Sequence, residues 1–344
     1  MSNLQNQFTV HFWGVRGSIA CPGSETVRYG GNTPCVEMRV GSERLIFDGG
    51  TGLRVLGQSL LAQMPVTGHL FFSHYHWDHI QGFPFFVPAF IKINTFYIYG
   101  TIAPDGSTVQ HRLNDQMLHP NFPVPLQIMG ADLKFVDIKV GTTFYIYGTI
   151  APDGSTVQHR LNDQMLHPNF PVPLQIMGAD LKFVDINVGK SIKISDDIIV
   201  ETALLNHPGE AVGYRVNWRN YAAAYVSDTE HFPDRLDENV LFLARNADVL
   251  IYDATYTNEE YYSEKTSKVG WGHSTWQEAV KVAKAANVKR LVIFHHDPLH
   301  NDDFMDKTGE QVAEQFPNSL IAREGLSIQL SSPLNSSPPV SQSA

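Results

Sequence analysis

The sequence predicts a layered α/β protein whose functional site lies on one rim of a sheet. Short apolar runs rich in β-branched and aromatic residues alternate with loops, and they end at, or directly before, Asp, His or Ser. These expected strands are residues 44–47, 70–73, 222–227, 249–252 and 290–294. Because polar groups follow apolar strands directly, we expect the chemistry to gather at one edge of the sheet.

The clearest expected helix covers residues 274–286. Ser274 is expected to cap it, with Gln277 at the third helical position completing a capping box. Four apolar side chains recur at helical spacing and predict one buried stripe: Trp276, Ala279, Val280 and Ala283.

Charge and composition restrict what the protein binds. The 344 residues are 43% hydrophobic and 17% charged, which is typical of globular proteins, and the formal net charge is −10. A field of that sign repels nucleic-acid phosphates, so sequence-independent nucleic-acid binding is disfavoured. A substrate that carries phosphate would need local help, which bound metal could supply.

The expected compartment is the cytoplasm. The two cysteines, Cys21 and Cys35, do not form a CxxC arrangement and suit reduced thiols. Residues 1–9 lack the features of a signal peptide, and no run of 18 apolar residues exists, so no membrane partner is expected. We expect one domain over residues 1–330, followed by a disordered Ser/Pro-rich tail at residues 331–344.

An identical tandem repeat lies inside this expected domain. Residues 95–138 recur letter for letter as residues 143–186. Identical segments have identical packing preferences, so the two copies compete for one place in the fold. We expect one copy, or a hybrid of both, to pack normally and the surplus to be inert, with an extended substrate arm or a dimer contact as alternatives.

The strongest chemical signal is the segment FFSHYHWDHIQG at residues 71–82. His74, His76, Asp78 and His79 lie within six positions, directly after an expected strand. A lone histidine is more often a hydrogen-bonded core residue. Three imidazoles and a carboxylate together are instead typical ligands of zinc, and they also suit iron or manganese.

This motif resembles that of the metallo-β-lactamase superfamily, which implies a four-layer αββα sandwich. Later segments resemble the ribonuclease Z and cyclic-phosphodiesterase branch of that superfamily. The resemblance implies three more ligands: His207 in LNHPG at 205–209, Asp228 in YVSDTE at 225–230, and His295 in LVIFH at 291–295. The adjacent His296 is the alternative to His295, which is favoured because it directly follows the strand.

Further segments carry the same resemblance. DATY at residues 253–256 and GHST at residues 272–275 imply that Asp253 and His273 form a catalytic pair. Residues 13–36 and 46–52 are similar to phosphonate-pathway cyclic phosphodiesterases, in which Asp48 matches a structural acid beneath the metals. The helix N-terminus is expected to depress the pKa of His273, and Asp253 to oppose that effect.

The chain also departs from ribonuclease Z. The DATY position is usually glutamate there, and no glycine- and proline-rich arm that grips transfer RNA is present. The aromatic and proline-rich segment FPFFVPAF suits the covering of a pocket instead. Seven further histidines are expected at outer or non-essential positions: His111, His119, His159, His167, His231, His296 and His300.

We therefore expect a metal-dependent phosphodiesterase that uses a hydroxide held by two divalent ions, with zinc expected and manganese or iron as alternatives. His74, His76 and His207 would hold one ion, and Asp78, His79 and His295 the other. Asp228 would bridge them, and Asp78 would also act in catalysis with the His273–Asp253 pair. The expected substrate is a small phosphodiester, and the resemblance implies a homodimer. The alternatives are a ribonuclease Z-like RNA 3′-end endonuclease and a metal-stabilised binding or regulatory protein without turnover.

Overall fold

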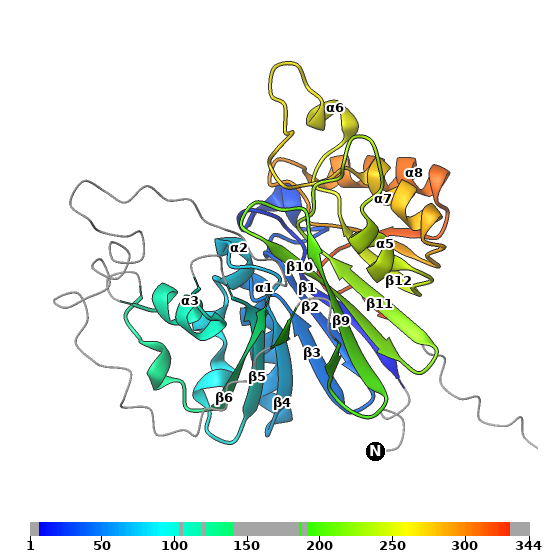
Figure 1. The fold of residues 1–344 in the computed structure, drawn as a ribbon. Coiled ribbons are helices and arrows are strands. Elements are labelled where there is room, and N and C mark those ends of the chain that lie inside the picture. The colour runs from blue at the N-terminus through cyan, green and yellow to red at the C-terminus, as the bar shows by residue number, and fades with distance from the viewer. Residues whose placement is uncertain (1–6, 103–105, 119–121, 140–185, 188–190, 331–344) are drawn as a thin grey trace, which may run out of the picture.

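Two β-sheets face each other in the computed structural model (Figure 1), which describes residues 7–102, 106–118, 122–139, 186–187 and 191–330. The strand order is β15-β1-β2-β3-β4-β5-β6-β7 in the first sheet and β14-β13-β12-β11-β10-β9-β8 in the second. The strands of the first sheet are β1 (Phe8–Gly14), β2 (Cys35–Val40), β3 (Glu43–Phe47), β4 (Thr67–Phe71), β5 (Thr95–Thr101), β6 (Asp132–Lys139), β7 (Ile186–Asn187) and β15 (Ser327–Gln329). Those of the second are β8 (Ile192–Lys193), β9 (Ile198–Leu205), β10 (Ala211–Trp218), β11 (Tyr221–Val226), β12 (Val249–Asp253), β13 (Leu291–Phe294) and β14 (Ser319–Ile321).

Each sheet combines antiparallel and parallel pairing. In the first sheet, β1 to β3 pair antiparallel and β3 to β7 pair parallel. In the second, β8 to β11 pair antiparallel and β11 to β14 pair parallel. Parallel neighbours end at the same edge, so residues that follow β4, β11, β12 and β13 can meet at one rim.

The main core lies between the two sheets. Phe47 and Phe71 of the first sheet stack with ring centroids 5.2 Å apart. Tyr214 and Tyr225 of the second sheet each lie 5.5 Å from Phe47. All four are fully buried, so aromatic packing holds the two sheets face to face.

Helices cover both outer faces, and two further cores lie beneath them. Beside the first sheet lie α1 (Thr51–Leu60), α2 (Trp77–Ile80) and α3 (Val109–Gln116), and beside the second α5 (Glu238–Ala244), α7 (Trp276–Ala285) and α8 (Asp302–Gln315). The short helix α6 (Asn258–Tyr261) lies in a loop that extends beyond the sandwich. Short 3₁₀ turns occupy Ser24–Thr26, Leu61–Gln63, Phe83–Phe85, Val87–Phe90 and Leu126–Ile128. The expected four-layer αββα arrangement is confirmed.

The first copy of the repeat packs in the first sheet. It forms β5, α3 and β6, and β5 pairs in parallel with both β4 and β6. Of the second copy, the structure describes only Ile186, which begins β7 and pairs with its counterpart Ile138. The expected bulge of the surplus copy and the expected disordered tail lie outside the described residues.

The start of α7 corrects one expectation. Thr275 caps this helix by accepting from the backbone N–H of Glu278, and the expected capping box of Ser274 and Gln277 does not form. The Ser274 hydroxyl lies 3.0 Å from Nδ1 of His231 instead, because its position one residue before the cap turns it towards that ring. The predicted apolar stripe of the helix is buried, as expected.

Among the described residues, no helix combines the length and the apolar character that crossing a membrane requires.

Candidate metal centre

Loops that leave the ends of four strands build the candidate metal centre. The HYHWDH segment follows β4, His207 follows β9, Asp228 follows β11 and His295 follows β13. Asp228 and His295 have positive φ angles, of 56° and 62°. Non-glycine residues rarely adopt this backbone, and such strain is concentrated at functional sites. The turns bring side chains from both sheets to one rim.

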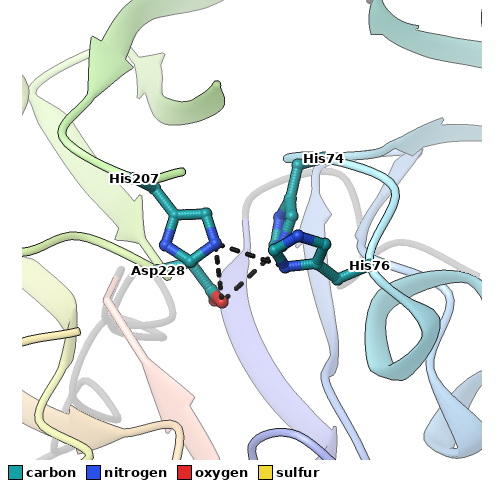
Figure 2. A group of neighbouring side chains, drawn as sticks. All are labelled: His74, His76, His207 and Asp228. Atoms are coloured by element: carbon teal, nitrogen blue, oxygen red, sulfur yellow. Dashed lines mark hydrogen bonds and ion pairs between the residues drawn. The ribbon is translucent and has the colours of Figure 1, made fainter. Parts of the chain in front are cut away.

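The first group of ligand atoms comes from His74, His76, His207 and Asp228, and all four atoms lie within 4.8 Å of one another (Figure 2). Nε2 of His207 is 3.3 Å from Nδ1 of His76. Oδ2 of Asp228 is 3.7 Å from Nε2 of His74 and 4.0 Å from Nε2 of His207. Three imidazoles and one carboxylate oxygen thus converge on one point.

The second group comprises Asp78, His79 and His295. Oδ2 of Asp78 lies 3.2 Å from Nε2 of His79 and 3.4 Å from Nε2 of His295. The other oxygen of Asp228, Oδ1, lies 3.2 Å and 3.4 Å from the same two nitrogens. Asp228 therefore turns one oxygen to each group, as a bridging carboxylate would.

Two ring nitrogens in these groups lack hydrogen bonds, as expected of atoms that bind a cation. Nε2 of His74 and Nε2 of His79 are buried and make no hydrogen bond, although carboxylates face them. Uncompensated buried nitrogens are costly, so their convergence needs a partner. Neutral imidazole and carboxylate are the ligands that zinc and related ions prefer. The residues present therefore fit a metal site.

Charge in the cluster supports this fit. Burial lowers the pKa of His74 well below its ordinary value, which keeps the ring in the neutral form that ligates metal. Burial also lowers the pKa of His79, but Asp228, Asp78 and Asp48 together raise it well above the ordinary value. The three carboxylates thus favour positive charge at the position of His79.

Asp48 orients residues of the centre through hydrogen bonds. It accepts hydrogen bonds from the Ser73 backbone N–H at 2.7 Å, from Nδ1 of His79 at 2.9 Å and from the Tyr225 hydroxyl at 2.8 Å. The bond to Nδ1 leaves Nε2 of His79 as the nitrogen that faces the cluster. The sequence indicated Asp48 but not its donors Ser73 and Tyr225, because nothing in their local pattern showed which way they point.

Two more candidate ligands are oriented by groups that the sequence did not indicate. Nδ1 of His207 lies 2.7 Å from the carbonyl oxygen of Gly272. The Thr255 hydroxyl lies 3.0 Å from Nδ1 of His295. Both belong to quoted motifs, GHST and DATY, whose spacing could have pointed to them.

Asp253 and His273 lie together beside the second group. Nδ1 of His273 is 2.9 Å from Oδ2 of Asp253 and 3.9 Å from Oδ2 of Asp228. Burial lowers the pKa of His273, but the Asp253 carboxylate outweighs that and raises it to about 9. The expected effect of Asp253 is therefore supported, whereas the opposing effect on the pKa comes from burial and not from the helix N-terminus that the sequence suggested.

The remaining histidines of the described chain lie outside the cluster. His296 points away from His295 and lies 2.8 Å from the carbonyl oxygen of Ala322. His300 lies 2.8 Å from Glu260, and His111 pairs with Asp115 on α3. Other positions expected to be non-essential, His119, His159 and His167, lie outside the described residues.

Comparisons with known proteins agree with this architecture. Residues 156–296 match the Beta-lactamase superfamily domain. Ribonuclease Z of Gemmatimonas aurantiaca is 32% identical over 40% of this chain, but the match spans only 38% of that relative. Ribonuclease Z of Pyrococcus horikoshii is 26% identical over 85% of this chain and 89% of its own length.

A solved structure shares the fold. The metallo-β-lactamase fold protein YhfI from Bacillus subtilis has a TM-score of 0.58 and 16% identity, covering 94% of this chain and 99% of that protein. The chain thus has the metallo-β-lactamase fold. The matched domain covers less than half of this chain, and the ribonuclease Z relatives are similar to it at modest identity.

Proposed function

We propose that the protein is a phosphodiesterase that holds two divalent cations, zinc by preference. The observation that carries this proposal is the convergence of seven ligand side chains from both sheets around buried imidazole nitrogens that lack hydrogen bonds. The carboxylates alone could not attract an anionic phosphate to a protein of net charge −10.

The distances between the ligand atoms assign the seven side chains to two cations. One cation would be held by His74, His76 and His207, and the other by Asp78, His79 and His295, with Asp228 shared. When bound, divalent cations lower the pKa of water from far above neutrality to about 7 and offset charge on phosphoryl oxygens.

His273 and Asp253 supply the proton chemistry in this proposal. Asp253 accepts from Nδ1 of His273 and is itself fixed by the Thr255 hydroxyl and the Thr229 backbone N–H. The ring is therefore held in one orientation, with Nε2 available to a substrate. We infer that His273 stabilises developing charge on the leaving oxygen or protonates it.

Replacing one ligand of each group tests the proposal. We expect His76→Ala and His79→Ala each to lower bound metal and to lower turnover of bis(p-nitrophenyl) phosphate at least about 100-fold. His111→Ala removes a surface histidine on α3 and serves as the matched control, with unchanged metal content and turnover. Full turnover in both ligand variants would end the proposal.

An RNA 3′-end endonuclease is the second candidate, because a ribonuclease Z relative matches 85% of this chain. Cleavage of a transfer-RNA precursor past its acceptor stem, with binding that weakens steeply as salt rises, would favour this candidate.

The third candidate is a metal-binding protein without turnover. Deletion of residues 95–142 distinguishes a protein that lacks an active site from one whose site is blocked, because activity gained on deletion means that the repeat had obstructed an intact site.

A further inference from the structure

The loop between β12 and α7 carries α6 and extends beyond the rest of the sandwich (Figure 1). Its last residues before α7 include Trp271, whose side chain is 57% exposed. Trp271 lies two positions before His273 and next to Gly272, whose carbonyl meets the metal-ligand candidate His207. The sequence neighbour of Trp271 thus contacts a candidate metal ligand, so a partly exposed indole ring lies on the loop that borders the proposed site.

The loop is held in place by a buried carboxylate. Glu230 is only 8% exposed and accepts from the backbone N–H groups of Gly270 and Gly272, at 2.6 Å and 3.0 Å. The Tyr261 hydroxyl at the end of α6 also donates to it. Trp271 lies between the two bonded glycines, so its backbone is fixed at the rim of the centre.

A lysine lies over the same indole ring. Nζ of Lys268 is 3.9 Å from the centroid of Trp271 and 5.6 Å from that of Tyr256. Tyr256 in turn lies 6.2 Å from the ring of His273 in an edge-to-face arrangement. Within the described chain, no carboxylate lies within ion-pair distance of the Lys268 ammonium. This cation is thus available to an anion beside a centre rich in carboxylates.

We propose that Trp271 and Lys268 form a specificity subsite on the His273 side of the centre, a proposal that rests on the phosphodiesterase function above. Trp271 would stack on a nucleobase of the substrate, and Lys268 would bind a second phosphate attached to that nucleotide. Stacking of a base on an aromatic side chain contributes about 1–3 kcal/mol and tolerates any base. The preferred substrate is then a nucleotide diester with an additional terminal phosphate.

Two dinucleotides separate the two contacts. TpT offers one diester and two bases, and pTpT adds a terminal phosphate. We expect Trp271→Ala to raise KM for both by about 5- to 150-fold with kcat within about 3-fold of wild type. Lys268→Gln should raise KM for pTpT by about 5-fold or more and leave KM for TpT unchanged. Phe242→Ala on α5 and Lys284→Gln on α7 are the matched controls, with unchanged KM for both dinucleotides.

Binding measured by equilibrium dialysis keeps this test separate from the proposed function. If the wild-type protein turns over neither dinucleotide but binds both, and the variants weaken binding as described, the subsite stands and the phosphodiesterase proposal fails. Equal binding of TpT and pTpT by wild type, or unchanged binding by the Trp271→Ala variant, overturns the subsite. Urea unfolding of each variant measures whether the fold is retained.

Discussion

Exchange of the Asp48 carboxylate for an amide should weaken metal binding without removing any ligand. Asp48 is fully buried, and its φ of 61° is one that asparagine adopts readily, so Asp48→Asn preserves the backbone. The side-chain NH₂ cannot lie at the Oδ1 position, because the Ser73 backbone N–H points there at 2.7 Å. It must take the Oδ2 position, because the Tyr225 hydroxyl that donates there can rotate and accept instead, and at that position it faces Nδ1 of His79 at 2.9 Å.

A donor at that position changes the tautomer of His79. In the wild-type protein, Asp48 accepts from Nδ1, which leaves Nε2 free to ligate. Opposite an NH₂ group, Nδ1 must accept instead, and the proton moves to Nε2, the atom 3.2 Å from both Asp78 and Asp228. A protonated nitrogen cannot bind a cation, so restoring the ligating tautomer carries a free-energy cost.

Loss of an orienting partner of this kind typically lowers metal affinity about 10- to 100-fold, or about 1.4–2.7 kcal/mol. Competition with a chromogenic chelator measures that affinity directly. Asp237→Asn is the matched control, because Asp237 caps α5 and asparagine caps equally well. Metal affinity in Asp48→Asn equal to that of wild type would refute the tautomer argument.

Three further outcomes are expected. A methyl group on Gly272 would meet Nδ1 of His207 at 2.4 Å, so Gly272→Ala should lower metal content on dialysis, and full metal retention would contradict this. Burial lowers the pKa of His69 to about 4, so the unfolded chain binds more protons between pH 6.5 and 4 and stability falls as pH falls. His69→Phe should remove up to about 2 kcal/mol of the loss between pH 7 and pH 5, measured by urea unfolding, whereas an unchanged loss would exclude His69 as its source. Phe71 is fully buried and its ring centroid lies 4.4 Å from that of Tyr99, so Phe71→Ala should cost about 3–5 kcal/mol of unfolding free energy, and a cost below about 1 kcal/mol would argue against a tightly packed core there.

Strand ends were the part of the fold that the sequence indicated best. The apolar runs before Asp48, Asp228, Asp253 and His295 are strands, because buried strands of β-rich residues are readable from local pattern. The αββα layering came from a resemblance, since periodicity alone does not state which strands pair. The exact start of α7 was wrong because Ser274 and Thr275 are both good caps, and only tertiary contacts decide between them.

Within the site, the structure brings together the residues that the motifs indicated. The groups that hydrogen-bond to these residues could not be predicted from the sequence. Tyr225 reaches Asp48 across 177 positions of sequence, and no local spacing encodes such a contact. Glu230 lies in the YVSDTE motif, but its bonds to Gly270 and Gly272 depend on the path of a loop 40 and 42 positions away. Long-range hydrogen bonds of this kind follow from topology.

The distribution of ligands over both sheets has a mechanical consequence. His74, His76, Asp78 and His79 extend from the first sheet, and His207, Asp228 and His295 from the second. Each bound cation would act as a noncovalent cross-link across the seam, and a ligand present at 100 times its Kd adds about 2.7 kcal/mol of stability. The free energy needed to separate the two sheets would then increase with the concentration of free metal ions.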